Sequence, residues 1–253
     1  LGSVEISDFL DVIVSPENHR AFLEAVLEFL ISPDGPDWDC LDLYNLLDDS
    51  PTLPVLEELA ADFSLRFFQE QIQPSPYIPL PNDFDDYLNG LDKKYRHEMK
   101  RKMRNAAKYP IPISWNYIED ETELEQAFND FGELMREDKE KNTFLTPPMV
   151  AQMWAIVQAA FQAGYLRLGF LNVGKERAVG MLNFDYANRI WVYNSGMSAK
   201  HESVSPGILL TSHMMLEAIE NGREAFDMMR GSEDYKYHMG GIDRFVIRAS
   251  VMR

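Results

Sequence analysis

Apolar and polar residues follow two different periodicities in the first part of the chain. Runs of apolar and β-branched residues predict strands, whereas apolar residues spaced three to four apart after Ser15-Pro16 and after Ser50-Pro51 predict helices. The predicted strands cover 9–14, 38–46 and 65–72. This order is β-α-β-α-β, and the proline-rich stretch 74–81 that follows predicts a domain junction.

The same periodicities continue through the rest of the chain. Helical spacing covers 84–108, as one long helix or a pair of helices, and then 121–138, 147–163 and the segment that begins at Ser205-Pro206-Gly207. A short helical turn is predicted at 234–238. Strands are predicted at 111–118, 165–173, 177–186, 189–196, 225–229 and 245–251. Three of these strands follow one another through short turns, which favours an antiparallel meander. The order of this part is therefore β-αα-βββ-α-β-α-β.

The composition of the 253 residues is that of a globular protein, with 45% apolar and 26% charged residues. The net charge of −17 argues against a general binder of DNA or of other polyanions. The charge is unevenly distributed, because residues 1–90 hold 19 acidic side chains against Arg20 and Arg66, whereas residues 91–110 hold eight basic side chains against two acidic ones. One cationic segment therefore interrupts an acidic chain.

The cationic segment, residues 93–108, permits three interpretations. Its side chains could hold a phosphorylated or nucleotide-linked substrate, they could bind RNA, or they could form a solvated helix face that pairs with the acidic N-terminal half. Only Tyr95 and Tyr109 accompany them as aromatic residues. A stacking surface for single-stranded nucleic acid therefore has little support.

Several classes of site lack the residues they need. Cys40 is the only cysteine, which excludes an internal disulfide and a thiolate zinc cluster and suits a reducing cytoplasm. We expect Cys40 itself to be a buried structural thiol. No apolar run is long enough for membrane insertion. The P-loop, Rossmann and zincin motifs are missing and the histidines lack ligand spacing, so no metal site is predicted.

Three sequence blocks in the second part carry a family resemblance. They are Lys93-Lys-Tyr-Arg-His-Glu-Met-Lys-Arg-Lys-Met-Arg104, Ser205-Pro-Gly-Ile-Leu-Leu210 and Phe226-Asp-Met-Met-Arg-Gly-Ser-Glu-Asp-Tyr-Lys236. Together with the element order, they resemble the GNAT superfamily of acyl-CoA-dependent N-acyltransferases. Within it they resemble the cellulose-biosynthesis acetyltransferase-like group, which is related to the Fem-type peptidoglycan aminoacyltransferases. The resemblance implies a mixed α/β (α+β) GNAT fold, with a largely antiparallel central sheet flanked by helices.

The resemblance also divides the chain. Residues 83–253 are expected to form the GNAT acyltransferase domain. Residues 1–82 resemble the trailing half of a second, degenerate GNAT-like unit, which usually precedes the catalytic unit in this group. We therefore expect further sequence upstream of Leu1.

The helix start at Ser205 is the candidate cofactor site. Unpaired backbone N–H groups and the helix dipole favour a phosphate or pyrophosphate there, and Gly207 allows a close approach. The resemblance implies that Ser203, Ser205, Gly207 and Ile208 bind acetyl-CoA or another acyl-CoA. The family's (Gln/Arg)-x-x-Gly-x-(Gly/Ala) loop is not present, however, and the segment is equally typical of a simple helix start.

Acyl transfer from a thioester to an amine requires a base for the ammonium proton, donors for the oxyanion and an acid for the departing thiolate. In the family the acid is commonly a tyrosine on the helix after the fifth strand, so the resemblance implies Tyr235 or Tyr237. Packing of the rings is the alternative. The other candidates are Asp185 and Asp227 as bases, and Asn183, Arg230 and Lys236 as substrate ligands. Solvation at strand ends and local ion pairs explain these residues equally well.

The leading interpretation is a cytoplasmic N-acyltransferase that moves an acyl group, such as acetyl, from acyl-CoA directly to an amine of a small molecule or peptide. No covalent enzyme intermediate is required. A Fem-type aminoacyltransferase that uses aminoacyl-tRNA is an alternative, and RNA is a partner only in that case. A GNAT-shaped scaffold without activity, in exopolysaccharide biosynthesis, is a third interpretation. No oligomeric state is predicted.

Overall fold

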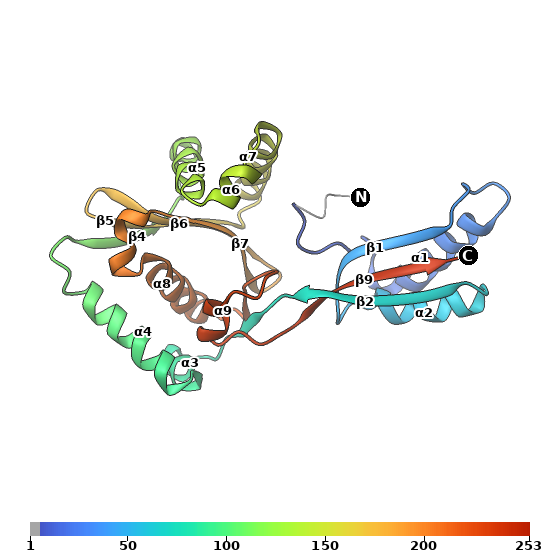
Figure 1. Ribbon diagram of the computed structural model, residues 1–253, viewed down its shortest axis with the longest axis horizontal. Helices are drawn as coiled ribbons and strands as arrows, with labels where there is room; N and C mark the ends of the chain where they lie inside the picture. Colours follow the sequence, from blue (N-terminus) through green and yellow to red (C-terminus); the bar gives the residue numbers. More distant parts are fainter. Residues whose placement is uncertain (1–5) are drawn as a thin grey trace. The chain divides into compact units, whose positions relative to one another are not determined.

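The computed structural model describes residues 6–253, and the chain divides into two compact units (Figure 1). The first unit contains the described residues up to Pro76, together with Arg230–Ser232 and Asp243–Arg253. The second unit contains Tyr77–Met229 and Glu233–Ile242. These units differ from the predicted ranges 1–82 and 83–253 chiefly because the C-terminal segment belongs to the first unit.

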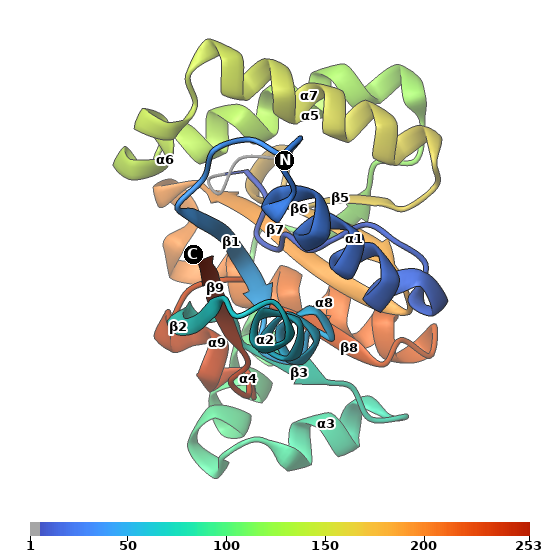
Figure 2. The ribbon, with the colours of Figure 1, turned by 90° about the vertical axis from the view of Figure 1, so that its right-hand side faces the viewer.

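A three-stranded antiparallel sheet and two helices form the first unit. The strands are β1 (Cys40–Leu47), β2 (Arg66–Pro74) and β9 (Phe245–Met252), in the order β1-β9-β2 (Figure 2). The helices are α1 (His19–Ile31), which follows the 3₁₀ turn η1 (Pro16–Asn18), and α2 (Thr52–Asp62). Their inner faces form an apolar core with the sheet, which includes Leu27, Leu56 and Val251.

The predicted strand at residues 9–14 does not form, although these residues are apolar and β-branched. The position between β1 and β2 is filled by β9, which pairs with both neighbours. The third strand of this sheet is therefore the C-terminal strand β9, and residues 9–14 are not part of the sheet. Cys40, which we expected to be buried, is exposed at the first position of β1.

A six-stranded sheet forms the centre of the second unit, in the order β3-β8-β7-β6-β5-β4. The strands are β3 (Tyr77–Pro79), β4 (Ile113–Tyr117), β5 (Leu166–Val173), β6 (Glu176–Tyr186), β7 (Arg189–Met197) and β8 (Ala225–Asp227). All neighbouring strands are antiparallel except β7 and β8. The sheet confirms the predicted mixed α/β fold and the predicted meander.

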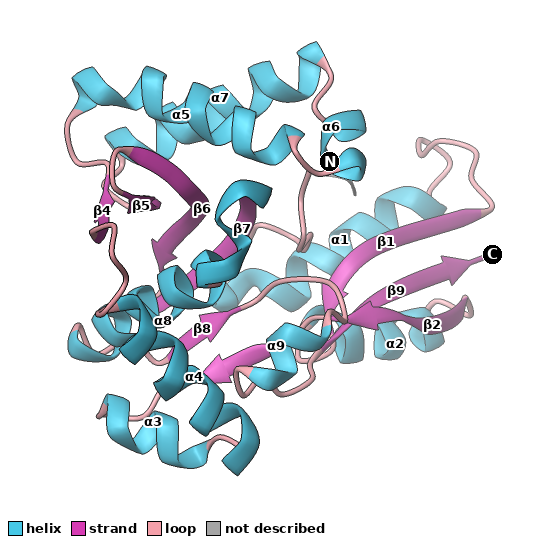
Figure 3. Ribbon diagram, turned by 60° about the vertical axis from the view of Figure 1, so that its left-hand side comes forward, coloured by secondary structure: helices cyan, strands magenta, loops and turns pink. Residues whose placement is uncertain are grey.

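Helices cover both faces of this sheet (Figure 3). On one face, α5 (Glu121–Arg136) and α7 (Pro147–Gln162) share an apolar cluster with β5 and β6. On the other face, α8 (Pro206–Glu220) shares a cluster with α3 (Phe84–Gly90) and α4 (Lys93–Ala106). The short helices α6 (Lys139–Phe144) and α9 (Asp234–His238) follow α5 and β8. Of the two possibilities for 84–108, one long helix or a pair, the structure therefore confirms the pair, α3 and α4, and α6 was not predicted.

The strands β7 and β8 separate after a short parallel pairing. Only Arg189–Trp191 of β7 pair with Ala225–Asp227 of β8. Beyond this point the register of β7 against β6 shifts, which leaves Tyr193 as an extra residue in a bulge. Among residues 6–253, the later part of β7 therefore has a neighbouring strand, β6, on one side only.

The backbone of Ser195 faces the edge that β8 leaves. The N–H of Ser198 donates to the carbonyl of Ala178 and so faces β6. Because successive residues of a strand face opposite edges, Ser195 and Met197 face the other way. An opened strand edge therefore lies directly before the loop that leads to α8.

Gly196 sets the distance between β7 and α5. A Cβ atom at this position would lie 2.4 Å from the backbone nitrogen of Met135 and 2.6 Å from the carbonyl carbon of Leu134. Only glycine permits this approach of strand and helix backbones. The approach carries the end of α5, and α6 after it, to the opened part of β7.

Candidate active site

The start of α8 carries the residues predicted to bind the cofactor. Ser205, directly before the helix, adopts the left-handed conformation with φ 53°, and its side chain makes no capping hydrogen bond. Pro206 has no N–H to offer. The N–H groups of Gly207 and Ile208 belong to the first turn and therefore have no acceptor within the helix. A Cβ placed on Gly207 would lie 3.8 Å from the Met197 sulfur, an ordinary contact distance, so this glycine lies beside the end of β7.

The 3₁₀ turn η2 (Ala199–Val204) holds this helix start in place. Glu176, the first residue of β6, accepts from Lys200 Nζ at 2.6 Å and lies 2.9 Å from His201 Nε2. The hydrogen bonds from Lys200 and then His201 lower the pKa of the Glu176 carboxyl. Ser203, the fourth predicted cofactor residue, is exposed in the same turn.

A cavity of about 130 Å³ lies between α4, the start of α8 and α9. It is lined by Tyr95, Glu98, Met99, Lys102, Ile208, Tyr235, His238 and Met239. The rings of Tyr95 and His238 stack with centroids 4.0 Å apart and form one wall. The structure therefore brings Tyr235 and Ile208, predicted for catalysis and for cofactor binding, into one cavity.

Tyr235 retains 41% of its surface exposed on α9. Burial of the hydroxyl, with a smaller contribution from the Glu233 charge, raises its pKa to about 12. The hydroxyl is therefore protonated at neutral pH, which is the state that a proton donor requires. Tyr237 lies half-buried on the same helix and does not line the cavity.

Lys141 of α6 reaches the opened edge of β7. Its Nζ donates to the Ser195 carbonyl at 2.5 Å and lies 3.4 Å from the Ser195 hydroxyl. The N–H of Ser195 donates to Oδ1 of Asn194 at 2.9 Å. Burial lowers the pKa of the Lys141 ammonium, whereas Asp138 and Glu233 oppose this shift.

Asp227 and Lys236 fix the turn that follows β8. The fully buried Asp227 carboxylate accepts from the N–H of Met229, which has φ 59°. Lys236 is 2% exposed and donates from Nζ to the Met229 carbonyl at 3.2 Å. Its Nζ is also 3.0 Å from Glu233. Both predicted site residues therefore bond to the protein's own turn.

Asp185 lies at the other end of β7 from the start of α8. It is opposite Ile190, the second residue of β7, and it is held by Arg167 at 3.1 Å and by Arg223 at 2.7 Å. Arg223 follows the C-terminal end of α8, a helix of 15 residues, which spans roughly 20 Å. The structure does not bring Asp185 to the first turn of α8.

Two other predicted substrate ligands also have partners within the fold. Asn183 is fully buried, and its Nδ2 is 3.1 Å from the sulfur of Met214 on α8. Arg230 belongs to the first unit, where its Nε is 2.9 Å from Asp8. Neither residue lines the cavity at Tyr235.

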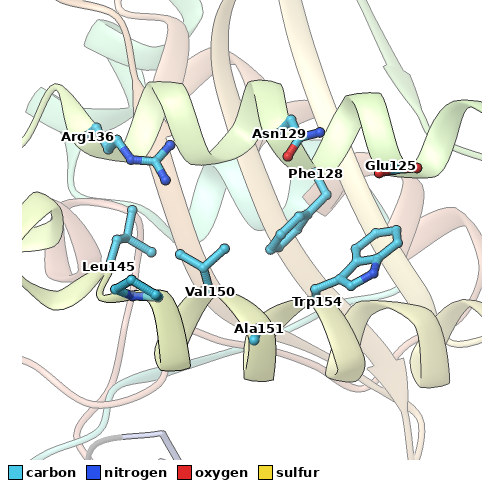
Figure 4. A pocket seen from close by; sticks show the side chains of 9 residues that line it. Glu125, Phe128, Asn129, Arg136, Leu145, Val150, Ala151 and Trp154 are labelled. Atoms are coloured by element: carbon cyan, nitrogen blue, oxygen red, sulfur yellow. The ribbon is translucent and has the colours of Figure 1, made fainter.

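A larger cavity, of about 410 Å³, lies between α5 and α7 (Figure 4). Phe128 of α5 and Trp154 of α7 pack together in its lining with ring centroids 5.2 Å apart, and Glu125 and Arg136 also line it. None of the predicted site residues lines it. Its size alone therefore does not mark it as the place of chemistry.

Within residues 6–253, no group of three or more histidine, cysteine, aspartate and glutamate side chains is arranged to hold a metal ion. In the same part of the chain, no helix is both long enough and apolar enough to cross a membrane.

A comparison with protein families identifies the class of protein to which the fold and the start of α8 belong. Residues 93–237 match the acetyltransferase (GNAT) domain family, and the chain belongs to this family. Apart from Arg230–Ser232, the match lies within the second unit. A comparison with curated proteins gave no match.

Several solved structures share the fold across nearly the whole chain. The crystal structure of FemX superposes with a TM-score of 0.66 at 12% identity, over 93% of this chain and 78% of that chain. A conserved protein of unknown function from Bacteroides thetaiotaomicron VPI-5482 superposes with a TM-score of 0.63 at 13% identity, over 92% of this chain and 75% of that chain. The C-terminal domain of a protein from Agrobacterium fabrum, described as a lysylphosphatidylglycerol synthetase, superposes with a TM-score of 0.61 at 11% identity. The superposition covers 96% of this chain and 76% of that chain.

Sequence reasoning did not find Lys141 or Glu233. Lys141 lies in a charged stretch that is typical of solvated surface, and Glu233 is one of two acidic residues directly before Tyr235, with no pattern that distinguishes it. The one local signal was Asp138, which caps α6 by accepting from the N–H groups of Glu140 and Lys141. That signal predicts a helix start and says nothing about the opened strand edge.

Proposed function

We propose that the chain is an N-acyltransferase that moves an acyl group, such as acetyl, from acyl-CoA directly to an amine. The GNAT domain supports acyl transfer as the class of reaction. The observation that carries the proposal is that Ile208 at the start of α8 and Tyr235 on α9 line one cavity, while the adjacent Gly207 lies near Met197 on the edge of β7 that β8 leaves. A donor with a phosphate end and an extended thioester arm fits this combination.

The residues at the helix start have the simplest role in this proposal. The backbone N–H groups at Gly207 and Ile208 bind the pyrophosphate, and Ser203 and Ser205 add hydroxyl groups next to them. Tyr235 gives its proton to the departing thiolate, with Tyr237 as the competing candidate. Asp227 and Lys236 hold the turn before α9 and thereby position Tyr235.

Titration calorimetry with acetyl-CoA tests the donor. We expect a dissociation constant in the micromolar range and, on Gly207→Asp, binding at least about 10-fold weaker, because the new carboxylate repels the pyrophosphate. Gly90→Asp is the matched control, since Gly90 lies in α3 and nothing lies within 4 Å of its Cβ position. If acetyl-CoA and longer acyl-CoA thioesters produce no heat, the donor assignment is wrong.

The acceptor is tested by the release of free thiol from acetyl-CoA. We expect release to depend on an added amine, and a panel of D-glucosamine, L-lysine and alanylalanine covers sugar, amino acid and peptide acceptors. Direct transfer predicts that the burst of thiol without acceptor is far smaller than one per enzyme. A stoichiometric burst would indicate a covalent acyl-enzyme instead.

A second candidate function, transfer from aminoacyl-tRNA, rests on α4. Its ion pairs are Lys102 with Glu98 at 2.9 Å and Lys100 with Asp85 at 3.9 Å, and Arg101 and Arg104 are exposed. The fold likeness to FemX agrees with a Fem-type relative without showing its donor. This candidate predicts salt-dependent binding of charged tRNA that falls at least about 10-fold when Lys100, Arg101 and Arg104 are changed to glutamate.

The same experiments separate the remaining interpretations. A chain that turns over acetyl-CoA and is unaffected by charged tRNA is the acyl-CoA enzyme. A chain that binds neither donor is the inactive scaffold for exopolysaccharide biosynthesis. The cellulose-biosynthesis-like grouping, the cytoplasmic location and the division into a half-domain at 1–82 and a catalytic domain at 83–253 belong to the same proposal.

A further inference from the structure

Lys141 occupies an unusual position for a lysine in a polar stretch. Its side chain is directed inward from α6, half-buried, onto the carbonyl of Ser195. Lys139, two residues earlier on the same helix, is exposed. The two lysines therefore differ in burial and partner, although their local sequence is similar.

The carbonyl that Lys141 contacts belongs to the opened edge of β7. Ser195 and Met197 face this edge, and the Met197 sulfur is the atom nearest to the Cβ position of Gly207, at the start of α8. A donor whose phosphate lies at that helix start and whose arm follows the strand edge passes Met197 and then Ser195. Lys141 Nζ, at the Ser195 carbonyl, therefore lies beside the path of such an arm.

The groups around Lys141 come from three elements. Asp138 at the start of α6 and Glu233 before α9 act on its charge, and Glu233 itself is 3.0 Å from Lys236. Ser195 of β7 offers a hydroxyl and a carbonyl, neither of which titrates near neutrality. Burial lowers the pKa of the Lys141 ammonium and so favours the neutral amine, whereas the two carboxylates raise this pKa.

We propose that Lys141 is a catalytic residue, whose side-chain nitrogen accepts the proton that the acceptor amine loses when it attacks the acyl carbon. The inference rests on the proposed function, because it requires an acyl donor at the edge of β7. It assigns the base, for which Asp185 and Asp227 were the candidates from sequence. Both of those carboxylates are engaged elsewhere in the fold.

The step balances without any further reactant. The nitrogen of the acceptor forms a bond to the acyl carbon while the C–S bond breaks and its electron pair leaves with sulfur. The proton from the acceptor nitrogen moves to the neutral Lys141 amine, and the thiolate takes the Tyr235 proton. Lys141 then loses its proton to solvent and Tyr235 regains one, so that the net products are an amide and free CoA thiol.

Lys141→Met and Lys141→Arg test the assignment, with Lys139→Met as the matched control. Acetyl-CoA is the donor, and the acceptor is the amine of the panel that gives the fastest thiol release with the unsubstituted chain. We expect kcat to fall at least about 100-fold in both Lys141 variants, because methionine has no base and arginine stays protonated. The dissociation constant of the Lys141 variants for acetyl-CoA should change less than about threefold. Lys139→Met should change kcat by less than about threefold.

The pH profile separates a proton acceptor from a structural lysine. In the unsubstituted chain kcat should rise with pH as Lys141 loses its proton, and in Lys141→Met this rise should disappear. Lys141→Met with unchanged kcat and an unchanged profile would overturn the assignment while leaving the proposed function intact. If the unsubstituted chain binds no acetyl-CoA, the proposed function fails, and the role of Lys141 fails with it.

A measurement on the unsubstituted chain covers the case in which the variants do not fold. Incubation with acetyl-CoA alone, followed by mass spectrometry of peptides, reports the acetylation rate of each lysine. A neutral amine beside a bound thioester predicts that Lys141 is acetylated at least about 10-fold faster than Lys139, at a rate that saturates with acetyl-CoA. Equal rates at the two lysines would overturn the inference.

Discussion

Tyr235 is the predicted catalytic residue that the structure places best, since it lines the cavity that Ile208 also lines. We expect Tyr235→Phe to lower kcat about 100-fold, because the departing thiolate loses its proton donor. Stability should change little, since 41% of the residue is exposed. Steady-state kinetics and thermal unfolding check both statements, and Tyr186→Phe, at an exposed position on β6, is the control.

The pH dependence of that reaction follows from the raised pKa of Tyr235. With a pKa of about 12, the hydroxyl stays protonated throughout the neutral range, so kcat should show no loss from this group up to about pH 10. A fall in kcat that begins near pH 8 and disappears in Tyr235→Phe would contradict this assignment. Tyr237→Phe tests the competing tyrosine in the same assay.

Asp185 is expected to affect stability more than catalysis. Its side chain is 9% exposed between Arg167 and Arg223, so Asp185→Ala leaves two cations without their carboxylate. We expect a loss of about 2–3 kcal/mol in the free energy of unfolding and a change in kcat below about threefold. Urea unfolding and steady-state kinetics measure the two effects. A kcat that falls 100-fold at unchanged stability would restore Asp185 as a catalytic base.

The candidate site could be predicted from sequence only where the chemistry is local. Ser205-Pro206-Gly207 begins a helix as its residue types dictate, and Tyr235 follows in a short helix that local spacing predicts. The position of Lys141 depends instead on the backbone approach at Gly196 and on where β8 ends. Both are contacts between segments far apart in sequence, which no local pattern encodes.

At the scale of an element, η2 is held by one carboxylate. Glu176 is bonded in its charged form by Lys200 and His201, which lowers its pKa below 4.5. A carboxyl with a lowered pKa stabilises the fold fully above its unfolded value, and this contribution disappears as pH falls through the folded value. The turn should therefore be held at neutral pH and released in acid.

Glu176→Gln tests this role at neutral pH. Hydrogen exchange should accelerate at the amides of residues 198–205, and binding of acetyl-CoA should weaken about three- to tenfold, because the start of α8 is less well positioned. Glu202→Gln is the control, an exposed carboxylate within η2 itself. The exchange rate of this segment could stay unchanged in Glu176→Gln, or rise as much in Glu202→Gln. Either result would show that the bond to Glu176 does not hold the turn.

Most elements follow from periodicity and from their end signals, and the exceptions share one physical cause. The meander β5-β6-β7 was predictable because short turns force neighbouring strands to pair. The segment at residues 9–14 has strand-like residues but forms no strand, and only one backbone hydrogen bond, from the N–H of Leu10 to the carbonyl of Asn45, is seen between it and β1. Strand propensity alone does not form a ladder, and the position between β1 and β2 is filled from the other end of the chain.

At the scale of the whole molecule, the two units have separate cores. The clusters under α5 and α7 and under α8 consist of residues of the second unit, whereas Ile247, Ala249 and Val251 of β9 belong to clusters of the first. The chain therefore leaves the first unit after Pro76, returns to it briefly at Arg230–Ser232, and rejoins it at Asp243. Removal of the returning segment should affect the two units differently.

A chain that ends at Ile242 tests this organisation. It lacks the central strand of the sheet β1-β9-β2, so β1 and β2 lose their shared partner and Leu56 and Leu59 lose the Val251 side of their core. We expect residues 6–76 to lose protection in hydrogen-exchange mass spectrometry, while residues 77–229 keep theirs because both of their cores are complete. A chain that ends at Met252 is the control. Loss of protection in both units at once would mean that they fold as one cooperative body, and activity could then not be assigned to the second unit alone.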